Sequence, residues 1–231
     1  MTAYLDGWTI AIDLDGTLVD TAPDLLAALN HVLSTQGLNA VPLSDIRSMV
    51  GHGAKAMIRE GFSWNDTKVD EAELEDRLWP DFIQYYTHHI CDESAIFPGA
   101  LDTMANLARS GAKLAVCTNK TQSLAEQVLD TLNLSERFVA VMGADRATKR
   151  KPHKAHLLET IQAAKGRPER ALLIGDSDTD ERAAQNAELP FVFVSFGYGE
   201  LTSNPLPTVR CVHSWNDVPT EVAHIAGALS A

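Results

Sequence analysis

The stretch "KLAVCTNKTQSLAEQVLDTLNL" (113–134) decides the fold, because it reads as a buried strand followed directly by an amphipathic helix. The apolar strand stops at Thr118 and Asn119, and leucine and valine then recur at helical spacing. The same order of elements returns in "ALLIGDSDTDERAAQNAE" (171–188). Apolar strands that alternate with helices are typical of a parallel sheet covered on both faces. The sequence therefore predicts a doubly wound α/β core.

The pattern extends in both directions along the chain. Further strands are expected at 8–13, 138–145, 191–197 and 208–212, and further helices at 100–111 and 153–166. Between the first strand and Phe97 the chain predicts helices only. We therefore expect a core made of 1–19 and 95–231, with an all-helical insert at 20–94.

Two helices of the insert lead to specific expectations. A helix is expected at 23–37, with Thr21 and Asp24 available to cap its start. A longer helix at roughly 68–90 contains Pro80, which should kink or split it because proline cannot donate the helical hydrogen bond.

Composition excludes several classes of protein. The 231 residues are 45% apolar and carry a net charge of −12, which argues against binding to nucleic-acid backbones and to anionic membrane surfaces. No apolar run approaches the length of a spanning helix, and the first ten residues do not resemble a secretory signal. The three cysteines are far apart, so neither a disulfide framework nor a paired-cysteine metal site is expected. We therefore predict a cytoplasmic protein.

Polar side chains gather where the predicted strands end. In an open α/β sheet, the working site lies outside the carboxyl ends of the strands. Asp13 and Asp15 follow the first strand, Thr118 follows the next, and Asp176 follows the strand at 171–175. Crowded carboxylates repel one another, and a hard cation such as Mg²⁺ relieves that repulsion. The sequence therefore predicts a Mg²⁺ site at this edge.

The same residues suit chemistry on a phosphate ester. Lys151 precedes a predicted helix, and its ammonium, like the Thr118 hydroxyl, can bind the non-bridging oxygens of a phosphate. A carboxylate held beside that phosphate can attack phosphorus. A second carboxylate two residues away can protonate the leaving oxygen and later activate water. Asp13 and Asp15 have the spacing for these two roles.

Four segments of the chain resemble, in order, the four motifs of the haloacid dehalogenase superfamily: "DLDGT" (13–17), "CTNK" (117–120), "KP" (151–152) and "GDSDTD" (175–180). The resemblance spans essentially the whole chain. It implies a Rossmann-like core, a Mg²⁺-dependent mechanism through an aspartyl-phosphate, and a small α-helical cap domain corresponding to the insert.

The resemblance also implies a role for each matching residue. Asp13 matches the nucleophile, and Asp15 matches the general acid/base, whose backbone carbonyl is a metal ligand in this family. Thr118 and Lys151 match the groups that hold the phosphate, and Asp176 completes the metal ligands. Supporting roles fall to Gly16, Thr17 and Asp180.

Within the superfamily the chain is most similar to the phosphoglycolate phosphatase branch. Asp15 argues against dehalogenases and phosphonatases, which lack an acid there, and Thr17 argues against sugar phosphomutases. One departure is Lys154, which replaces the second proline of the usual Lys-Pro-x-Pro motif. The cap loop "VGHGAK" (50–55) is expected to reach the substrate, and the candidate substrate contacts are Asn119, His52 and Lys55, with Thr118 and Lys151.

The predicted function is therefore hydrolysis of a small phosphorylated metabolite, with 2-phosphoglycolate as the expected substrate. A sugar-phosphate or nucleotide phosphatase, or a phosphomutase, is an alternative on the same machinery. A phospho-acceptor signalling module is the alternative from another class. The expected partner is a small phosphate ester, with no nucleic acid and no membrane, and the chain is expected to be a monomer or homodimer.

Overall fold

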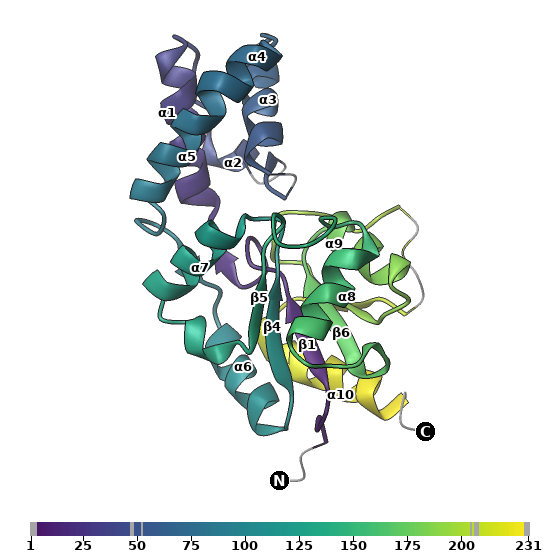
Figure 1. The fold of residues 1–231 in the computed structure, drawn as a ribbon. Coiled ribbons are helices and arrows are strands. Elements are labelled where there is room, and N and C mark those ends of the chain that lie inside the picture. Colours follow the sequence, from purple (N-terminus) through teal and green to yellow (C-terminus); the bar gives the residue numbers. More distant parts are fainter. Residues whose placement is uncertain (1–3, 47–48, 52, 204, 206–207, 229–231) are drawn as a thin grey trace.

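A six-stranded sheet forms the centre of the protein (Figure 1). The computed structural model describes residues 4–46, 49–51, 53–203, 205 and 208–228. All neighbouring strands of the sheet pair in parallel. In spatial order they are β5 (Ala140–Met142), β4 (Lys113–Cys117), β1 (Thr9–Ile12), β6 (Ala171–Gly175), β7 (Phe191–Val194) and β8 (Arg210–Val212).

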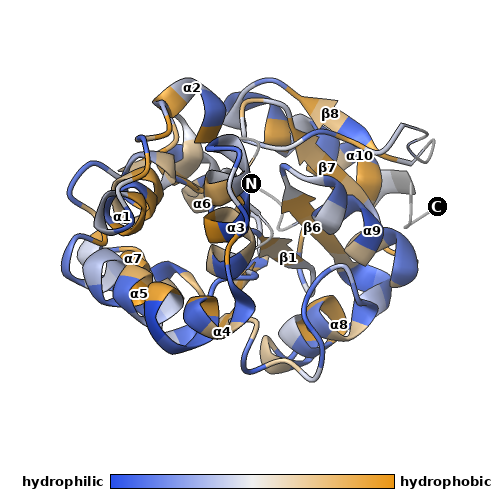
Figure 2. Cartoon of the chain, turned by 90° about the horizontal axis from the view of Figure 1, so that it is seen from above, coloured by the Kyte–Doolittle hydropathy of each residue, from blue (hydrophilic) through white to orange (hydrophobic). Residues whose placement is uncertain are grey.

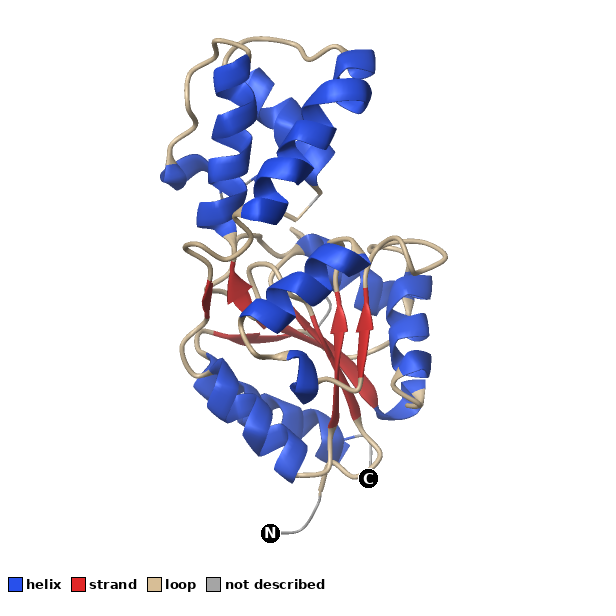
Figure 3. Cartoon of the chain, turned by 60° about the vertical axis from the view of Figure 1, so that its left-hand side comes forward, coloured by secondary structure: helices blue, strands red, loops and turns tan. Residues whose placement is uncertain are grey.

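Helices cover both faces of this sheet (Figure 3). One face carries α6 (Ala100–Arg109), α7 (Gln122–Thr131) and α10 (Val218–Ala228), and the other carries α8 (Lys154–Ala163) and α9 (Asp178–Asn186). Short 3-10 turns lie at Ser135–Arg137, Pro168–Arg170 and Trp215–Asp217. The central strands are apolar along their length (Figure 2), and β1, β6 and β7 are fully buried. The predicted doubly wound α/β core is confirmed.

The register of the sheet brings the strand ends to one level. Ile12 of β1 pairs with Val116 of β4 and with Ile174 of β6. The chain visits β4 and β5 on one side of β1 and then β6, β7 and β8 on the other. The strand order thus reverses at β1, where a crevice for ligands opens in folds of this kind. The residues that follow β1, β4 and β6 therefore meet at one crevice.

The helical insert stands over this same edge of the sheet (Figure 1). Its helices are α1 (Ala22–Thr35), α2 (Leu43–Ile46), α3 (Ala54–Trp64), α4 (Glu71–Glu73) and α5 (Trp79–His88). They pack on one another through buried apolar side chains such as Leu29, Phe62 and Phe82. The expected small helical cap is therefore present, and its boundaries at 20 and 94 stay a prediction.

The chain enters and leaves the cap through a two-stranded antiparallel ribbon that the sequence did not reveal. β2 (Val19–Asp20) pairs with β3 (Ala95–Ile96), so the two crossing segments lie side by side. Each strand has only two residues, which is too short for an apolar alternation to be visible in the sequence.

The capping roles expected for Thr21 and Asp24 are wrong. The side chain of Thr21 makes no capping hydrogen bond, and its hydroxyl donates instead to Asp15 at 2.7 Å. The Asp24 carboxylate accepts from the backbone N–H groups of Glu93 at 3.0 Å and Ser94 at 2.9 Å. Both side chains are used for long-range contacts beside the ribbon, which local spacing could not show.

The long cap helix changes its hydrogen-bonding pattern just before Pro80, as expected for a kink or split. A π-helical segment, Leu74–Leu78, joins α4 to α5. Pro80 then falls in the first turn of α5, where a missing N–H costs least. The three cysteines are free thiols, as expected, and none of the described helices is long and apolar enough to cross a membrane.

Candidate active site

A cavity of about 460 Å³ lies between the carboxyl ends of the strands and the cap. The core contributes Asp13, Asp15 and Asp176 to its wall, together with Thr118 and Asn119. The cap contributes mostly apolar and aromatic side chains: Leu25, Val50, Met57, Trp79, Phe82, Ile83 and Tyr86. These five polar residues, all singled out in the sequence, therefore line one cavity, with Lys151 and Asp180 buried beside it.

Lys151 is the positive centre of the site. Its ammonium lies 2.9 Å from Asp13 Oδ1 and 2.6 Å from Asp180 Oδ1, and it donates to the Cys117 carbonyl at 2.7 Å. The side chain is 1% exposed. Burial disfavours the ammonium, yet Asp13 and Asp180 outweigh burial and hold the pKa of Lys151 above its ordinary value. Lys151 therefore stays charged.

Three carboxylates surround that single ammonium. Among the described residues, Asp13, Asp176 and Asp180 offer oxygens that all lie within 4.8 Å of one another. Burial raises the pKa of Asp13 to about 8, and the nearby acids add to the effect against the pull of Lys151. Burial and the charge of Asp180 raise the pKa of Asp176 to about 6. The cluster carries more negative charge than Lys151 balances.

This cluster fits a hard divalent cation. The donors are all carboxylate oxygens, which Mg²⁺ prefers. Asp13 Oδ1 is buried and makes no well-directed hydrogen bond with any described residue, so it keeps a lone pair for a ligand. The Asp15 carboxylate accepts from Lys120 and Thr21, and the metal contact through its backbone carbonyl stays a prediction.

Three hydrogen-bond donors hold the Asp176 carboxylate in place, and its position explains why residue 16 is a glycine. It accepts from the Thr17 hydroxyl at 2.8 Å and from the backbone N–H groups of Tyr198 at 2.8 Å and Gly199 at 3.3 Å. Gly16 has a φ of +80°, and a Cβ there would lie 2.5 Å from Asp176 Oδ2. Only glycine fits so close to the carboxylate in this backbone conformation.

Asp15 is paired with Lys120, a residue that the sequence reasoning missed. The Lys120 ammonium lies 2.9 Å from both carboxylate oxygens of Asp15 and 4.9 Å from the centroid of the Tyr86 ring in the cap. Burial disfavours the charged lysine, yet Asp15 and Tyr86 outweigh it and raise the pKa of Lys120. The signal was present, since Lys120 ends the "CTNK" motif, but its partner is 105 positions away.

Thr118 and Asn119 stand at the end of β4 beside Lys151. Thr118 is 1% exposed, and its hydroxyl oxygen accepts from the backbone N–H of Lys120 at 3.1 Å, so its proton is free to be donated. Asn119 donates to the Lys151 carbonyl at 3.1 Å, whereas its own carbonyl oxygen has no partner among the described residues. Both residues line the cavity, and their contact with a substrate stays a prediction.

The expected cap contacts are less well defined. His52 lies outside the described residues. Lys55 lines the cavity, but its ammonium forms an ion pair with Glu75 and lies 4.4 Å from the centroid of the Trp79 ring. Its role as a substrate contact stays a prediction.

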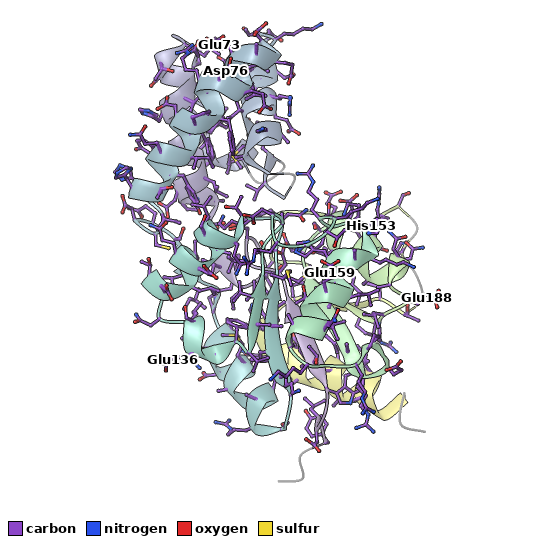
Figure 4. All side chains as sticks on the ribbon, in the orientation of Figure 1. Glu73, Asp76, Glu136, His153, Glu159 and Glu188 are labelled. Atoms are coloured by element: carbon purple, nitrogen blue, oxygen red, sulfur yellow. The ribbon has the colours of Figure 1, made fainter. Side chains whose placement is uncertain are left out.

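The residues that follow Lys151 start a helix rather than extend the site. His153, labelled in Figure 4, caps α8 by accepting from the Ala155 N–H at 3.1 Å. Lys154, which replaces the usual proline, is exposed at the first position of α8. The substitution therefore leaves Lys151 in place.

Two further residues support the site and carried no sequence signal that we used. His156 is buried, accepts from the Lys151 backbone N–H at 3.1 Å and lies 3.1 Å from the Met142 carbonyl through Nε2. Burial and the charge of Lys151 lower the pKa of His156 to about 4, so the ring is neutral and its Nε2–H donates. Tyr198 donates its hydroxyl to Asp20 at 2.6 Å and thereby joins the core to the ribbon.

Comparison with known proteins identifies the family of this chain. The family model described as haloacid dehalogenase-like hydrolase matches residues 10–194. The protein named phosphoglycolate phosphatase in Caulobacter vibrioides is 46% identical over 93% of this chain and 90% of its own. The one of that name in Agrobacterium fabrum is 42% identical over 82% of this chain and 81% of its own.

Solved structures show the same fold. A crystal structure of a predicted phosphoglycolate phosphatase from Haemophilus somnus superposes with a TM-score of 0.83 at 25% identity, over 94% of this chain and 97% of that one. The match of the family model and the length of the similarity to curated relatives leave one assignment: this chain belongs to the haloacid dehalogenase-like hydrolases.

Proposed function

We propose that the protein is a Mg²⁺-dependent phosphomonoesterase that converts 2-phosphoglycolate to glycolate and phosphate. The observation that carries this proposal is the position of Asp13: its carboxylate lies 2.9 Å from the Lys151 ammonium and lines the cavity with Asp15. The names of the relatives from Caulobacter vibrioides and Agrobacterium fabrum support the choice of substrate.

The first half-reaction transfers the phosphoryl group to the protein. The substrate phosphate binds between the Lys151 ammonium and the Thr118 hydroxyl, both of which donate to its non-bridging oxygens. An oxygen of Asp13 forms a bond to phosphorus while the bond from phosphorus to the leaving oxygen breaks. Asp15 gives its proton to that oxygen, and glycolate leaves.

The second half-reaction returns the protein to its starting state. Asp15, now a carboxylate, accepts a proton from water as the water oxygen attacks phosphorus. The bond between phosphorus and Asp13 breaks, and inorganic phosphate is released. The contacts from Lys120 and Thr21 hold Asp15 in place for both steps.

The residues that would hold Mg²⁺ are Asp13, Asp176 and Asp15, the last through its backbone carbonyl, while Asp180 would support the site through Lys151. When bound, Mg²⁺ offsets the negative charge of the carboxylates and of the phosphate. Asp180 is 2.6 Å from Lys151 and accepts from the Ser177 hydroxyl at 2.6 Å, so it orients the lysine more directly than it faces the cavity.

A sugar-phosphate or nucleotide phosphatase is the second candidate. A cavity of about 460 Å³ with aromatic walls offers more room than glycolate fills. We place 2-phosphoglycolate first because the relatives from Caulobacter vibrioides and Agrobacterium fabrum are named for it.

The test is phosphate release from 2-phosphoglycolate, hexose phosphates and nucleoside monophosphates, each with Mg²⁺ and with a chelator. A strong preference for 2-phosphoglycolate that is lost with the chelator supports the proposal. A preference for a larger ester would overturn the substrate, and a phosphoprotein that persists for minutes would favour a signalling module.

A further inference from the structure

Lys120 holds a buried positive charge at the place where the leaving group would sit. Its side chain is 5% exposed and lines the cavity. The ammonium lies 2.9 Å from both carboxylate oxygens of Asp15. Asp15 is the residue that we propose protonates the leaving oxygen. Whatever is attached to that oxygen therefore lies within reach of Lys120.

Tyr86 of cap helix α5 completes this corner of the cavity. The residue is 1% exposed, and its hydroxyl makes no well-directed hydrogen bond with any described residue. The Lys120 ammonium beside this hydroxyl is itself a donor, so the phenol proton has no acceptor among the described residues and can be donated to a ligand atom in the cavity. Burial raises the pKa of Tyr86, which keeps the hydroxyl protonated and able to donate.

The other cations of the cavity are placed less well for the leaving group. Lys55 and Arg59 line it from the cap, and each forms an ion pair with a glutamate of the cap itself. Arg150 lines it from the core loop and is exposed. The Asp15 carboxylate forms an ion pair with Lys120 and, among the described residues, with no other lysine or arginine.

We propose that Lys120 and Tyr86 form a subsite for a carboxylate next to the leaving oxygen, and that this subsite selects 2-phosphoglycolate over uncharged phosphate esters. In glycolate, a single methylene carbon separates the leaving oxygen from the carboxylate carbon. A leaving oxygen at Asp15 thus brings the carboxylate to the ammonium and the phenol. The inference rests on the proposed function and extends it to the basis of specificity.

The experiment compares two substrates and two variants. 2-Hydroxyethyl phosphate has the size of 2-phosphoglycolate but lacks the carboxylate. Tyr86→Phe keeps the ring beside Lys120 and removes only the hydroxyl, whereas Lys120→Met removes the charge and keeps most of the volume. kcat and KM are measured for both substrates with Mg²⁺ present.

The readout is the ratio of kcat/KM for the two substrates. Hydrogen bonds to charged groups of this kind correspond to about a 10- to 100-fold effect. Lys120→Met should lower the preference for 2-phosphoglycolate by roughly 100-fold, and Tyr86→Phe by roughly tenfold, mainly through KM. Arg150→Met is the matched control from the same cavity, and it should leave the ratio unchanged.

The outcomes separate this inference from the proposed function. If wild type prefers 2-phosphoglycolate but both variants lose activity equally on the two substrates, the subsite is wrong and Lys120 acts only on Asp15. If wild type shows no preference for 2-phosphoglycolate, the proposed substrate fails first. Should Lys120→Met not fold, Tyr86→Phe decides the question, because it preserves the packing of the ring.

Discussion

Replacing Asp13 by asparagine should abolish turnover and, in the absence of metal, stabilise the protein. The amide is a poor nucleophile, so no phosphoryl group is transferred to it. The carboxylate it replaces is buried beside Asp176 and Asp180 with only the Lys151 ammonium to balance three acids. Asparagine removes one of these negative charges, so the electrostatic repulsion that destabilises the folded protein at its active site becomes weaker.

The size of the effect follows from the pKa of Asp13. Burial raises it from an ordinary 3.8 to about 8. At about 1.4 kcal/mol per pH unit, this displacement corresponds to roughly 6 kcal/mol of lost stability above pH 8. That pKa already includes the opposing attraction to Lys151, and we expect the variant to be more stable than wild type by about 3 kcal/mol or more. For a chain of 231 residues that is roughly 5–10 °C in Tm.

The sign of the pH dependence is fixed by the direction of the shift. The folded protein binds the Asp13 proton more tightly than the unfolded chain does, so its contribution to stability is full below pH 3.8 and is lost as pH rises toward 8. Asparagine does not titrate. The advantage of the variant should therefore be clearly smaller at pH 5, where only the first part of this loss has occurred, than at pH 8.

The assay is thermal unfolding of wild type and variant with a chelator at pH 5 and pH 8, alongside phosphate release with Mg²⁺. Asp178→Asn is the matched control, because Asp178 lies nearby, is 33% exposed and pairs with Arg182 at 3.0 Å instead of joining the cluster. A variant that melts at or below wild type at pH 8, or that retains more than a trace of activity, would refute the reasoning.

Three other substitutions test the site. Lys151→Ala should lower kcat/KM by at least about 1,000-fold in a phosphate-release assay. Lys154→Ala should change kcat/KM less than about twofold, because Lys154 is exposed. Equal losses for the two variants would mean that the wrong lysine is assigned. Gly16→Ala should remove most phosphatase activity, because the added Cβ would clash with Asp176. Gly37 has a φ of +67° and open space around it, so Gly37→Ala should lower the free energy of unfolding in urea by only about 1 kcal/mol. His156→Leu should lower kcat at least about tenfold, because it removes the acceptor of the Lys151 backbone N–H. His156→Asn keeps an acceptor near the Nδ1 position and should recover part of the lost kcat in the same assay. A leucine variant with normal kcat would exclude a positioning role for His156.

The capping predictions were wrong because the side chains involved can form hydrogen bonds either with the nearby helix end or with residues far away in the sequence. Thr21 and Asp24 have the right types and spacing for a helix cap, yet one binds Asp15 and the other binds the backbone at Glu93 and Ser94. A local cap and a long-range contact compete for the same oxygen, and spacing describes only the first. The same limit hid Tyr198, which meets Asp20 across 178 positions.

The sequence by itself determined the α/β class, the place of the helical insert and the edge of the sheet where Asp13, Thr118 and Asp176 meet. It could do so because parallel strands of similar length, in register, must end at one level, so residues that follow them are neighbours whatever the side chains do. Only the tertiary structure decided the pairing of Lys120 with Asp15 and Tyr86. That contact joins three elements through flexible side chains, and the choice of partner depends on burial and charge balance once the elements are already packed.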